Sequence, residues 1–296
     1  MFIMSGQKKI IFDCDNTMGV KGCDVDDGLA LLYLLGEGNR EICGITTTYG
    51  NSDIETVYHN TSKMLQEIGR PGINLFKGCP NPGVLESEAA DFIVETVNAY
   101  PGQISILATG SLTNLRGAYL KDQDIFTKIP QIVLMGGITQ KLIINGKVLD
   151  ELNFSCDPAA TALVLEQGNN MSVITGNHCL DAYFSGEEFA QKLKTCSKPV
   201  ARYIWDKCNY WFEDMMETFE LDGFHNWDVV AAAYLIRPEL FDDKEIMITP
   251  NVSLLKQGWL VYQSGDRQKS TVNTPKIKNI NSFKERIYNA WLSVEI

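Results

Sequence analysis

The chain has 296 residues, of which 45% are hydrophobic and 21% are charged. Its 26 basic and 37 acidic side chains give a formal charge of −11 with no Lys/Arg cluster, which argues against binding to a nucleic-acid backbone. Apolar residues are plentiful and evenly spread, so the composition excludes a disordered chain and allows a self-sufficient core.

The sequence predicts neither a membrane segment nor a secretory signal. The longest apolar stretches, such as residues 29–35, fall short of the ~20 residues that cross a bilayer. The start, MFIMSGQKK, lacks a basic segment followed by an apolar core and a cleavage site. The eight cysteines include no C-x-x-C pair, which favours reduced thiols. We therefore expect a cytoplasmic protein with neither a membrane nor a nucleic acid as partner.

Short β-branched runs alternate with helical patterns along most of the chain. The runs predict buried strands at Lys8–Asp13, Ile42–Thr48, Ile104–Thr109, Ile132–Met135 and Met171–Thr175. Apolar residues at three-to-four spacing predict helices at Asp26–Leu35, Asp53–Ile68, Ser87–Ala99, Thr113–Tyr119 and Asp157–Glu166. This alternation indicates an α/β fold, with a mostly parallel central sheet flanked by helices.

The pattern changes after residue 240. Strand-like runs at Glu245–Leu255, Gly258–Tyr262 and Ser270–Ile277 precede a helix from about Ser282. We expect these runs to form an antiparallel extension of the same sheet. No repeat or long linker divides the chain, so residues 1–296 are expected to form a single domain.

Carboxylates gather just after the first predicted strand, where open parallel sheets bind ligands. They are Asp13, Asp15, Asp24, Asp26 and Asp27. Their mutual repulsion requires a cation or very good hydrogen bonding, and oxygen-only ligands favour Ca²⁺ or Mg²⁺ over zinc. A simpler alternative is that Asp26 caps the next helix while Asp13 and Asp24 are solvated, but it explains only part of the group.

One alternative function begins at the same aspartates. The segment Asp13-Cys14-Asp15-Asn16-Thr17 resembles the D-x-D-x-T motif of haloacid-dehalogenase-type phosphatases, which are Mg²⁺ phosphohydrolases. In that family the first Asp is the nucleophile and the second is the acid/base. The family also needs a later Lys and an acidic pair, and neither Gly265-Asp266 nor Asp242-Asp243 is well placed.

A longer resemblance starts at the same strand. The string DCDNTMGVKGCDVDDGLALLYLLG (13–36) resembles the opening of the inosine-uridine-type nucleoside hydrolases, whose motif is D-x-D-P-G-x-D-D-A-x-A-L. Further segments agree in the same order: ITTTYGN (45–51), ILATGSLTNL (106–115), IVLMGG (132–137), ELNFSCDPAA (151–160) and NWDVVAAAYLI (226–236). The resemblance covers residues 8 to about 240 and implies the nucleoside hydrolase fold, which is Rossmann-like.

The resemblance implies a Ca²⁺ ion that holds the attacking water and two ribose hydroxyls. It places Asp15 as metal-ligating general base and Asp27 as bidentate ligand. Thr109 would ligate through its carbonyl oxygen, and Asp228 would be the distant acidic ligand. Asp26 and Asn51 fall where the family holds ribose hydroxyls and the water.

Two departures from the family affect these assignments. Ten residues, Asn16 to Val25, replace the usual Pro-Gly-x bridge, so Asp24 could take the metal position given to Asp15. The segment Pro80–Glu88 is also shorter than the family's loop over the active site. The pocket is then more open, unless the inserted Asn16–Cys23 covers it.

Asn145, Glu151 and Asn153 keep the family's N-x5-E-x-N spacing, which places polar groups on the sugar. For Asn145-Gly146 the alternative is a type I′ hairpin turn. Where many members have His before the distal Asp, this chain has Trp227, as in purine-preferring relatives. Its ring would stack on the base, although a core position is an equal alternative.

Two further groups bear on the leaving base. His225 is a candidate substitute acid, although a lone His is more often a satisfied loop residue. The aromatic residues Tyr203, Trp205, Tyr210, Trp211 and Phe212 could wall the base pocket, although such a run is more often core or interface.

We therefore expect a Ca²⁺-dependent enzyme that hydrolyses the N-glycosidic bond of nucleosides to free base and ribose. Water would be the nucleophile, an Asp the general base, and the transition state oxocarbenium-like. The resemblance also implies a homo-oligomer, either a homodimer or a homotetramer. A non-catalytic nucleoside-binding homologue remains an alternative.

Overall fold

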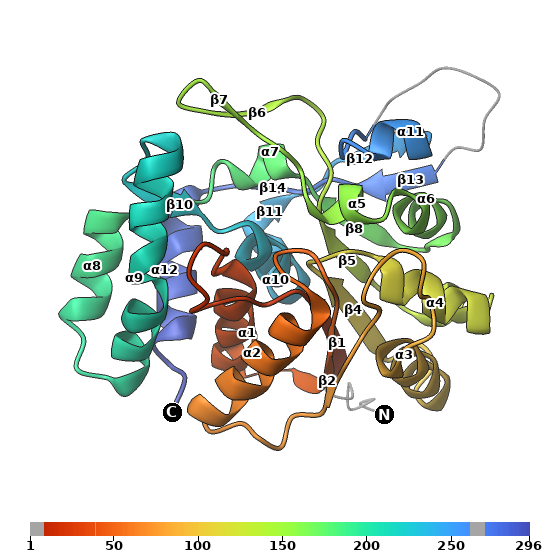
Figure 1. The fold of residues 1–296 in the computed structure, drawn as a ribbon, viewed down its shortest axis with the longest axis horizontal. Helices are drawn as coiled ribbons and strands as arrows, with labels where there is room; N and C mark the ends of the chain where they lie inside the picture. Colours follow the sequence, from red (N-terminus) through yellow and green to blue (C-terminus); the bar gives the residue numbers. More distant parts are fainter. Residues whose placement is uncertain (1–8, 39, 261–269) are drawn as a thin grey trace, which may run out of the picture.

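The computed structural model describes residues 9–38, 40–260 and 270–296, and its centre is an eight-stranded sheet (Figure 1). In spatial order the strands are β12 (Glu245–Ile248), β13 (Ser270–Asn273), β8 (Met171–Ile174), β5 (Ile132–Met135), β4 (Ile104–Ala108), β1 (Lys9–Cys14), β2 (Glu41–Thr47) and β3 (Leu75–Phe76). β12 pairs antiparallel with β13, and the other neighbours pair in parallel.

The strand order reverses beside β1. The chain passes from β1 to β2 and β3 on one side, and from β4 to β5 and β8 on the other. Ligands of open parallel sheets bind at the carboxyl ends of the strands flanking such a reversal. The loops after β1 and β4 therefore frame the expected site.

Helices cover both faces of the sheet, and each face has its own apolar core (Figure 1). In β1, Ile10 and Phe12 face one core while Ile11 faces the other, as expected for alternating side chains. The first core contains helices α1 (Asp26–Glu37), α2 (Ile54–Glu67), α8 (Gly186–Lys194), α9 (Pro199–Phe219), α10 (Trp227–Ile236) and α12 (Ile280–Trp291). The second contains α3 (Glu88–Ala99), α4 (Thr113–Lys121), α6 (Pro158–Gln167) and α11 (Val252–Leu255).

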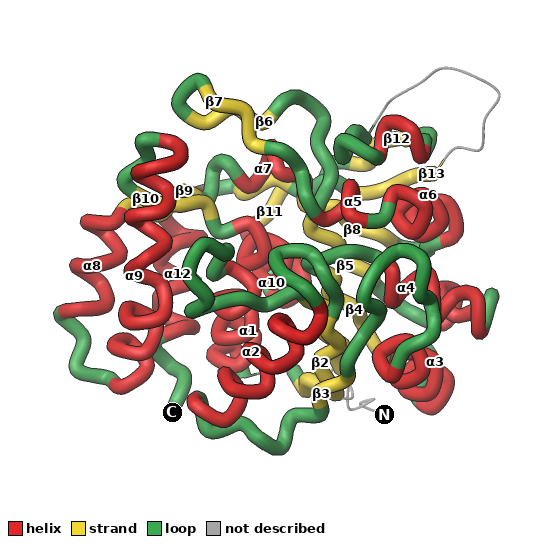
Figure 2. Tube along the Cα trace, in the orientation of Figure 1, coloured by secondary structure: helices red, strands yellow, loops and turns green. Residues whose placement is uncertain are grey.

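Short elements lie around this framework (Figure 2). Three antiparallel pairs are β6 (Leu142–Ile144) with β7 (Lys147–Leu149), β9 (Tyr183–Ser185) with β10 (Gly223–His225), and β11 (Phe241–Asp242) with β14 (Lys276–Ile277). The remaining turns are α5 (Asn153–Cys156), α7 (Gly176–Cys179), η1 (Ile125–Lys128) and η2 (Pro238–Leu240).

The predicted fold class is confirmed, with one correction in the tail. The antiparallel extension exists as β12, but the predicted strand Glu245–Leu255 ends at Ile248. Residues 252–255 form α11 instead, because the Asn251 side chain accepts a hydrogen bond from Ser253 N and caps a helical turn.

The other two predicted runs of the tail also changed. The run Ser270–Ile277 is divided into β13 and β14, which pair in different sheets on either side of Pro275. The run Gly258–Tyr262 lies partly outside the described residues, and Trp259 forms an isolated parallel bridge with Ile138.

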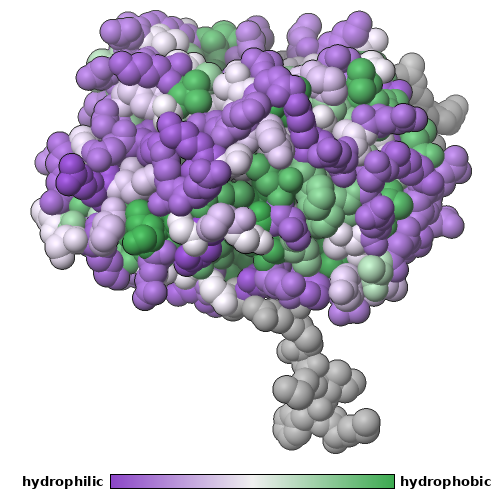
Figure 3. All heavy atoms as spheres, turned by 60° about the horizontal axis from the view of Figure 1, so that its bottom comes forward, coloured by the Kyte–Doolittle hydropathy of each residue, from purple (hydrophilic) through white to green (hydrophobic). Residues whose placement is uncertain are grey.

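Polar side chains dominate the face of the molecule shown in Figure 3, with apolar residues gathered near its middle. No helix within the described ranges is both long and apolar enough to cross a membrane. The single domain expected over residues 1–296 stays a prediction.

Candidate active site

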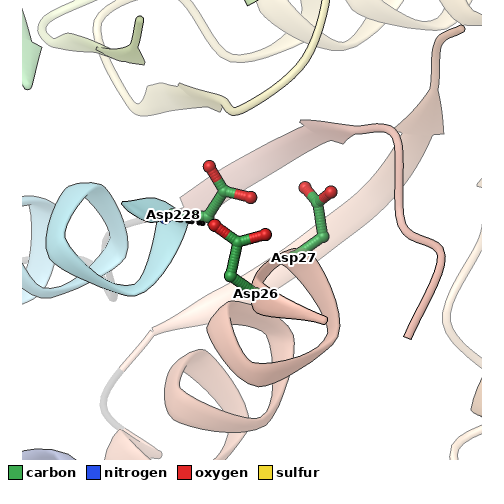
Figure 4. Close-up of side chains that lie close together, drawn as sticks. All are labelled: Asp26, Asp27 and Asp228. Carbon is green, nitrogen blue, oxygen red and sulfur yellow. Dashed lines mark hydrogen bonds between the residues drawn. The ribbon is translucent and has the colours of Figure 1, made fainter. Parts of the chain in front are cut away.

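Three aspartates meet at the first turns of two neighbouring helices. Asp26 and Asp27 open α1, and Asp228 lies in the first turn of α10 (Figure 4). One carboxylate oxygen from each lies within 4.8 Å of the others. All three side chains are buried, and Asp228 N donates a hydrogen bond of 3.1 Å to Asp26 Oδ2. Helix N-termini favour negative charge, so both helices partly offset the repulsion.

Asp15, just after β1, extends this group of carboxylates. It is fully buried, and its charge adds to burial in raising the pKa of the neighbouring Asp27 carboxyl group. Asn51 N donates to Asp15 Oδ2 at 2.6 Å, and Asn51 Nδ2 lies 3.5 Å from Asp27 Oδ2. A Cβ at position 50 would overlap the Asp15 carboxylate, so Gly50 is required for this approach.

Asp13 lies behind this group and plays a different part. Its Oδ1 accepts hydrogen bonds from Thr46 Oγ1 at 2.6 Å and Asn114 Nδ2 at 2.7 Å. The side chain is fully buried, and it does not line the cavity described below. Asp13 therefore joins β1, β2 and α4 beneath the site.

Thr109 follows β4 and contacts the cluster through its side chain. Its Oγ1 donates to Asp27 Oδ1 at 2.6 Å. Its carbonyl oxygen accepts a hydrogen bond of 2.9 Å from Asn153 Nδ2, which also donates to Met135 O at 3.2 Å. A carbonyl has two lone pairs, so the Thr109 oxygen retains one for a ligand.

Burial raises the pKa of every carboxyl group in this cluster. It raises the pKa of Asp15 to about 6 and that of Asp13 to about 7. Burial, reinforced by neighbouring carboxylates, holds the pKa values of Asp24, Asp27 and Asp228 well above the usual range, and that of Asp26 is also raised. The pKa values are raised because ionising several buried carboxyl groups close together is unfavourable unless a cation offsets their charge.

The donor set fits a hard divalent cation. It consists of carboxylate and carbonyl oxygens, the ligands that Ca²⁺ and Mg²⁺ prefer. Asp15 Oδ1 is buried and has no hydrogen-bond partner within the described residues. A cation would satisfy that oxygen and offset the charge, so the residues present fit a metal.

A cavity of about 730 Å³ opens beside the cluster. Asp26, Asp228, Asn51 and Thr109 line one part of it. Apolar and aromatic side chains line much of the remainder: Met135, Leu142, Ile144, Leu149, Leu152, Trp211, Met215, Phe219, Phe224 and Trp227. This combination of a polar floor and apolar walls is typical of small-molecule sites.

The three residues expected on the sugar are in different situations. Glu151 and Asn153 line the cavity. The Glu151 carboxylate accepts hydrogen bonds from the main-chain N–H groups of Gly137, Phe154 and Ser155. Asn145 is exposed at the β6–β7 turn, with φ of 49°, and donates to Phe219 O and Glu220 O. The structure does not bring Asn145 to the cavity, and the turn accounts for it.

Trp227 and His225 both line the cavity, with ring centroids 5.2 Å apart. Burial lowers the pKa of His225 to about 4, so its ring is neutral at pH 7. Of the aromatic residues proposed as a wall, Trp211 lines the cavity; Tyr203, Trp205, Tyr210 and Phe212 do not.

The inserted segment 16–25 reaches the same cavity, where Gly22, Cys23 and Asp24 contribute to the lining. Asp24 Oδ1 accepts a hydrogen bond from Val25 N at 2.6 Å. Tyr210 donates to Cys23 O at 2.9 Å, and Gly22 N donates to Asp214 Oδ2 at 3.2 Å. The insertion thus lies against α9 over part of the site.

The chain matches the family model for inosine-uridine preferring nucleoside hydrolases over residues 10–285. It belongs to that nucleoside hydrolase family. A probable uridine nucleosidase of Oryza sativa is 25% identical, with 96% of this chain and 94% of the relative covered.

Two solved structures share the nucleoside hydrolase fold. A plant nucleoside hydrolase aligns with a TM-score of 0.83 at 20% identity, covering 97% of this chain and 99% of that one. A purine-preferring ribonucleoside hydrolase from Gardnerella vaginalis aligns with a TM-score of 0.78 at 21% identity, with the same coverage.

Membership of this nucleoside hydrolase family makes the chain an enzyme of a metal-dependent class that hydrolyses nucleosides. The phosphohydrolase alternative is therefore wrong, and its presumed nucleophile Asp13 is buried behind the cavity. The sequence reasoning did not assign roles to Thr46 and Asn114, which hold Asp13. Asn114 lies within the ILATGSLTNL segment, which was the available signal.

Proposed function

We propose that this hydrolase cleaves the N-glycosidic bond of nucleosides, releasing free base and ribose, and that its cofactor is Ca²⁺. One observation carries the proposal. Buried carboxylates 202 positions apart in the chain meet beside a cavity of about 730 Å³, a volume suited to a small molecule.

Ca²⁺ would be held by Asp15, Asp27, Asp228 and the carbonyl oxygen of Thr109. Asn51 contacts both carboxylates, with its N 2.6 Å from Asp15 Oδ2 and its Nδ2 3.5 Å from Asp27 Oδ2, which supports Asp15 as a ligand. Asp24 Oδ1 instead accepts a hydrogen bond from its own neighbour Val25. When bound, the cation would neutralise carboxylate charge and make a nearby water easier to deprotonate.

The chain's own groups then account for the reaction. Asp15 accepts the proton of the attacking water, and Asn51 orients that water from the adjacent loop. Asp26 and Asp228, which line the cavity, accept hydrogen bonds from ribose hydroxyls. Glu151 and Asn153 bound the sugar on another side. The surrounding carboxylates stabilise the positive charge that develops on the ribosyl ring in the transition state.

Trp227 is proposed to bind the departing base by stacking. It lines the cavity next to the Asp228 main chain. The neutral state of His225 argues against that residue as the acid that protonates the base. Stacking on an indole depends on a π face rather than on hydrogen bonds, so it tolerates different bases.

We further propose that the enzyme is cytoplasmic, as its cysteine pattern favours, and that it forms a homodimer or homotetramer, as the family resemblance implies. Light scattering of the purified protein would give the stoichiometry directly. A monomer at micromolar concentration would contradict this part.

The activity test uses purified protein with Ca²⁺ and a panel of purine and pyrimidine nucleosides, scored for free base and ribose. We expect turnover by the wild type and a loss of at least about a thousandfold in Asp27→Asn, with the circular dichroism spectrum unchanged. Asp91→Asn, an exposed position on α3, is the matched control and should retain full activity.

The test has three informative outcomes for the proposed activity. Release of base by the wild type but not by Asp27→Asn supports the proposal. Recovery of unchanged nucleoside after tight binding would identify a non-catalytic homologue. Release of no base from any nucleoside, without tight binding of any of them, would refute the assignment.

A further inference from the structure

Beyond the aspartates, one face of α9 forms a wall of the cavity. Trp211, Asp214, Met215 and Thr218 line it at helical spacing, and Glu217 lies beside them. The wall therefore combines an indole ring with two carboxylates. Neither carboxylate belongs to the cluster proposed to hold the metal.

The charged side chains that line the cavity are all acidic. The acidic members of the lining are Asp24, Asp26, Asp150, Glu151, Asp214, Glu217 and Asp228, and its described residues include no Lys or Arg. Two lysines belong to nearby elements, but neither lysine lines the cavity. Lys207 of α9 pairs with Glu67, and Lys147 of the β6–β7 hairpin pairs with Glu220. A cavity with one sign of charge concentrates ligands of the opposite sign.

Two indoles add a second attraction for positive charge. Trp211 and Trp227 both line the cavity, and tryptophan is the strongest of the aromatic side chains at binding cations through its ring face. The Trp211 Nε1 and His225 Nδ1 atoms are buried and have no hydrogen-bond partner among the described residues.

Trp227 and His225, which line the cavity beside Asp228, provide no acid for a neutral leaving base. Trp227 cannot donate a proton to a departing anion, and the buried His225 ring is neutral. A base that already carries positive charge needs no such acid.

We propose that this site prefers nucleosides whose base is cationic, such as N-ribosyl pyridinium compounds, over neutral nucleosides. This inference rests on the proposed function. Asp214 and Glu217 attract the charged base, and Trp211 and Trp227 contact its ring. These four side chains determine specificity, while the aspartate cluster acts on the sugar.

The bond changes balance for such a substrate. The bond between the ribose C1′ and the base nitrogen breaks, and its electron pair stays on nitrogen, which neutralises the cationic ring. The water oxygen forms the new bond to C1′, and the proton that water loses passes to the Asp15 carboxylate. The products are a neutral base, ribose and one proton, and no oxidant or acid donor is consumed.

The first experiment measures binding without turnover. Calorimetry on the Ca²⁺-loaded protein compares nicotinamide methylated on its ring nitrogen, a permanent cation, with neutral nicotinamide. We expect the cation to bind at least fivefold more tightly. Asp214→Asn and Glu217→Gln should each reduce that preference about threefold. Glu213→Gln, exposed on α9 and outside the lining, removes the same charge and should leave the preference unchanged.

The second experiment compares kcat/KM for nicotinamide riboside with the values for uridine and inosine. We expect the cationic nucleoside to exceed both by about tenfold or more, and the excess to shrink in Asp214→Asn through a higher KM. Measuring wild type and variant on the same substrates cancels the intrinsic lability of the cation.

The two experiments separate the two claims. Equal or weaker binding of the cation, or a binding preference for the cation that persists in both Asp214→Asn and Glu217→Gln, overturns this inference even when nucleosides are hydrolysed. If no nucleoside is hydrolysed, the proposed function fails, and the binding comparison still decides whether the cavity prefers cations.

Discussion

Thr109 serves the proposed metal site with both its main chain and its side chain. The carbonyl oxygen is a proposed ligand, and the hydroxyl donates to Asp27 Oδ1 at 2.6 Å. Hydrogen bonds of this kind hold a ligating carboxylate in position, and their loss typically costs 10–100-fold in metal affinity. We therefore expect Thr109→Val to weaken Ca²⁺ binding by about that factor, as measured by calorimetry.

Thr109→Ser is the matched control for this prediction. It keeps the main-chain carbonyl and the hydroxyl and removes only a methyl group. Its Ca²⁺ affinity should remain within about threefold of the wild type. Equal affinity in the valine and serine variants would mean that the hydroxyl does not orient Asp27.

For single residues, the sequence predicted which side chains belong to the site better than it predicted what each of them contacts. The aspartates could be assigned because they lie after strands and match the family's motif, and the structure brings Asp26, Asp27 and Asp228 together. The place of Asn145 could not be predicted from N-x5-E-x-N spacing, because the same Asn-Gly dipeptide also satisfies a tight turn.

The segment 16–25 is the element in which this chain departs most clearly from the family's opening motif. Asn60 Nδ2 of α2 donates to Asn16 O and Met18 O, both at 3.2 Å, and Tyr210 of α9 donates to Cys23 O. The segment thus joins two helices and carries Cys23 and Asp24 into the cavity lining.

Removing one of these contacts should loosen the segment without disturbing the helices. Tyr210→Phe deletes a hydrogen bond of 2.9 Å, and a bond of that kind contributes about 1 kcal/mol net. We expect KM for a nucleoside to rise about fivefold, with faster amide hydrogen exchange at residues 19–24. Tyr203→Phe deletes a hydrogen bond of 3.0 Å from α9 to Glu67 and should change neither quantity. A matching rise in KM for both variants would assign the effect to α9 itself.

Elements of the central sheet could be predicted because buried parallel strands are continuous apolar runs bounded by polar turns. The prediction for Ile132–Met135 coincides with β5. The same reasoning was wrong at residues 252–255, where Val, Ser and Leu fit a strand or a helical turn equally well. The cap from Asn251 decides between the two, and it depends on one side-chain contact.

On the scale of the whole molecule, one ion-pair network connects α1, α10 and α12 of the first core. The carboxylate of Glu37, at the end of α1, accepts from Arg237 Nε at 2.9 Å and from Arg286 Nε and Nη2. Arg237 follows α10 and Arg286 belongs to α12. Because α1 and α10 also carry Asp26, Asp27 and Asp228, the same helix pair supports both the fold and the site.

Glu37 gives stability a defined pH dependence. Burial alone would raise its pKa, but hydrogen bonds from Arg286 and Arg237 lower it below the usual value. The folded state then binds this proton less readily than the unfolded state, so the contribution is complete above about pH 5 and falls as pH drops through the ordinary glutamate pKa of about 4.3 and then the lower folded value. Glu37→Gln should therefore be less stable by about 2 kcal/mol at pH 7. This is less than the roughly 3–5 kcal/mol lost when a fully buried pair is broken, because both arginines are partly exposed.

Urea unfolding of the wild type and Glu37→Gln from pH 7 to about pH 3 measures this directly, and the difference should narrow as the pH falls. Glu55→Gln is the matched control, because Glu55 is exposed and pairs with Lys77 at the surface. Its effect should stay below about 1 kcal/mol at every pH. A difference for Glu37→Gln that is constant across the range would mean that the side chain stabilises the helices by packing rather than by charge.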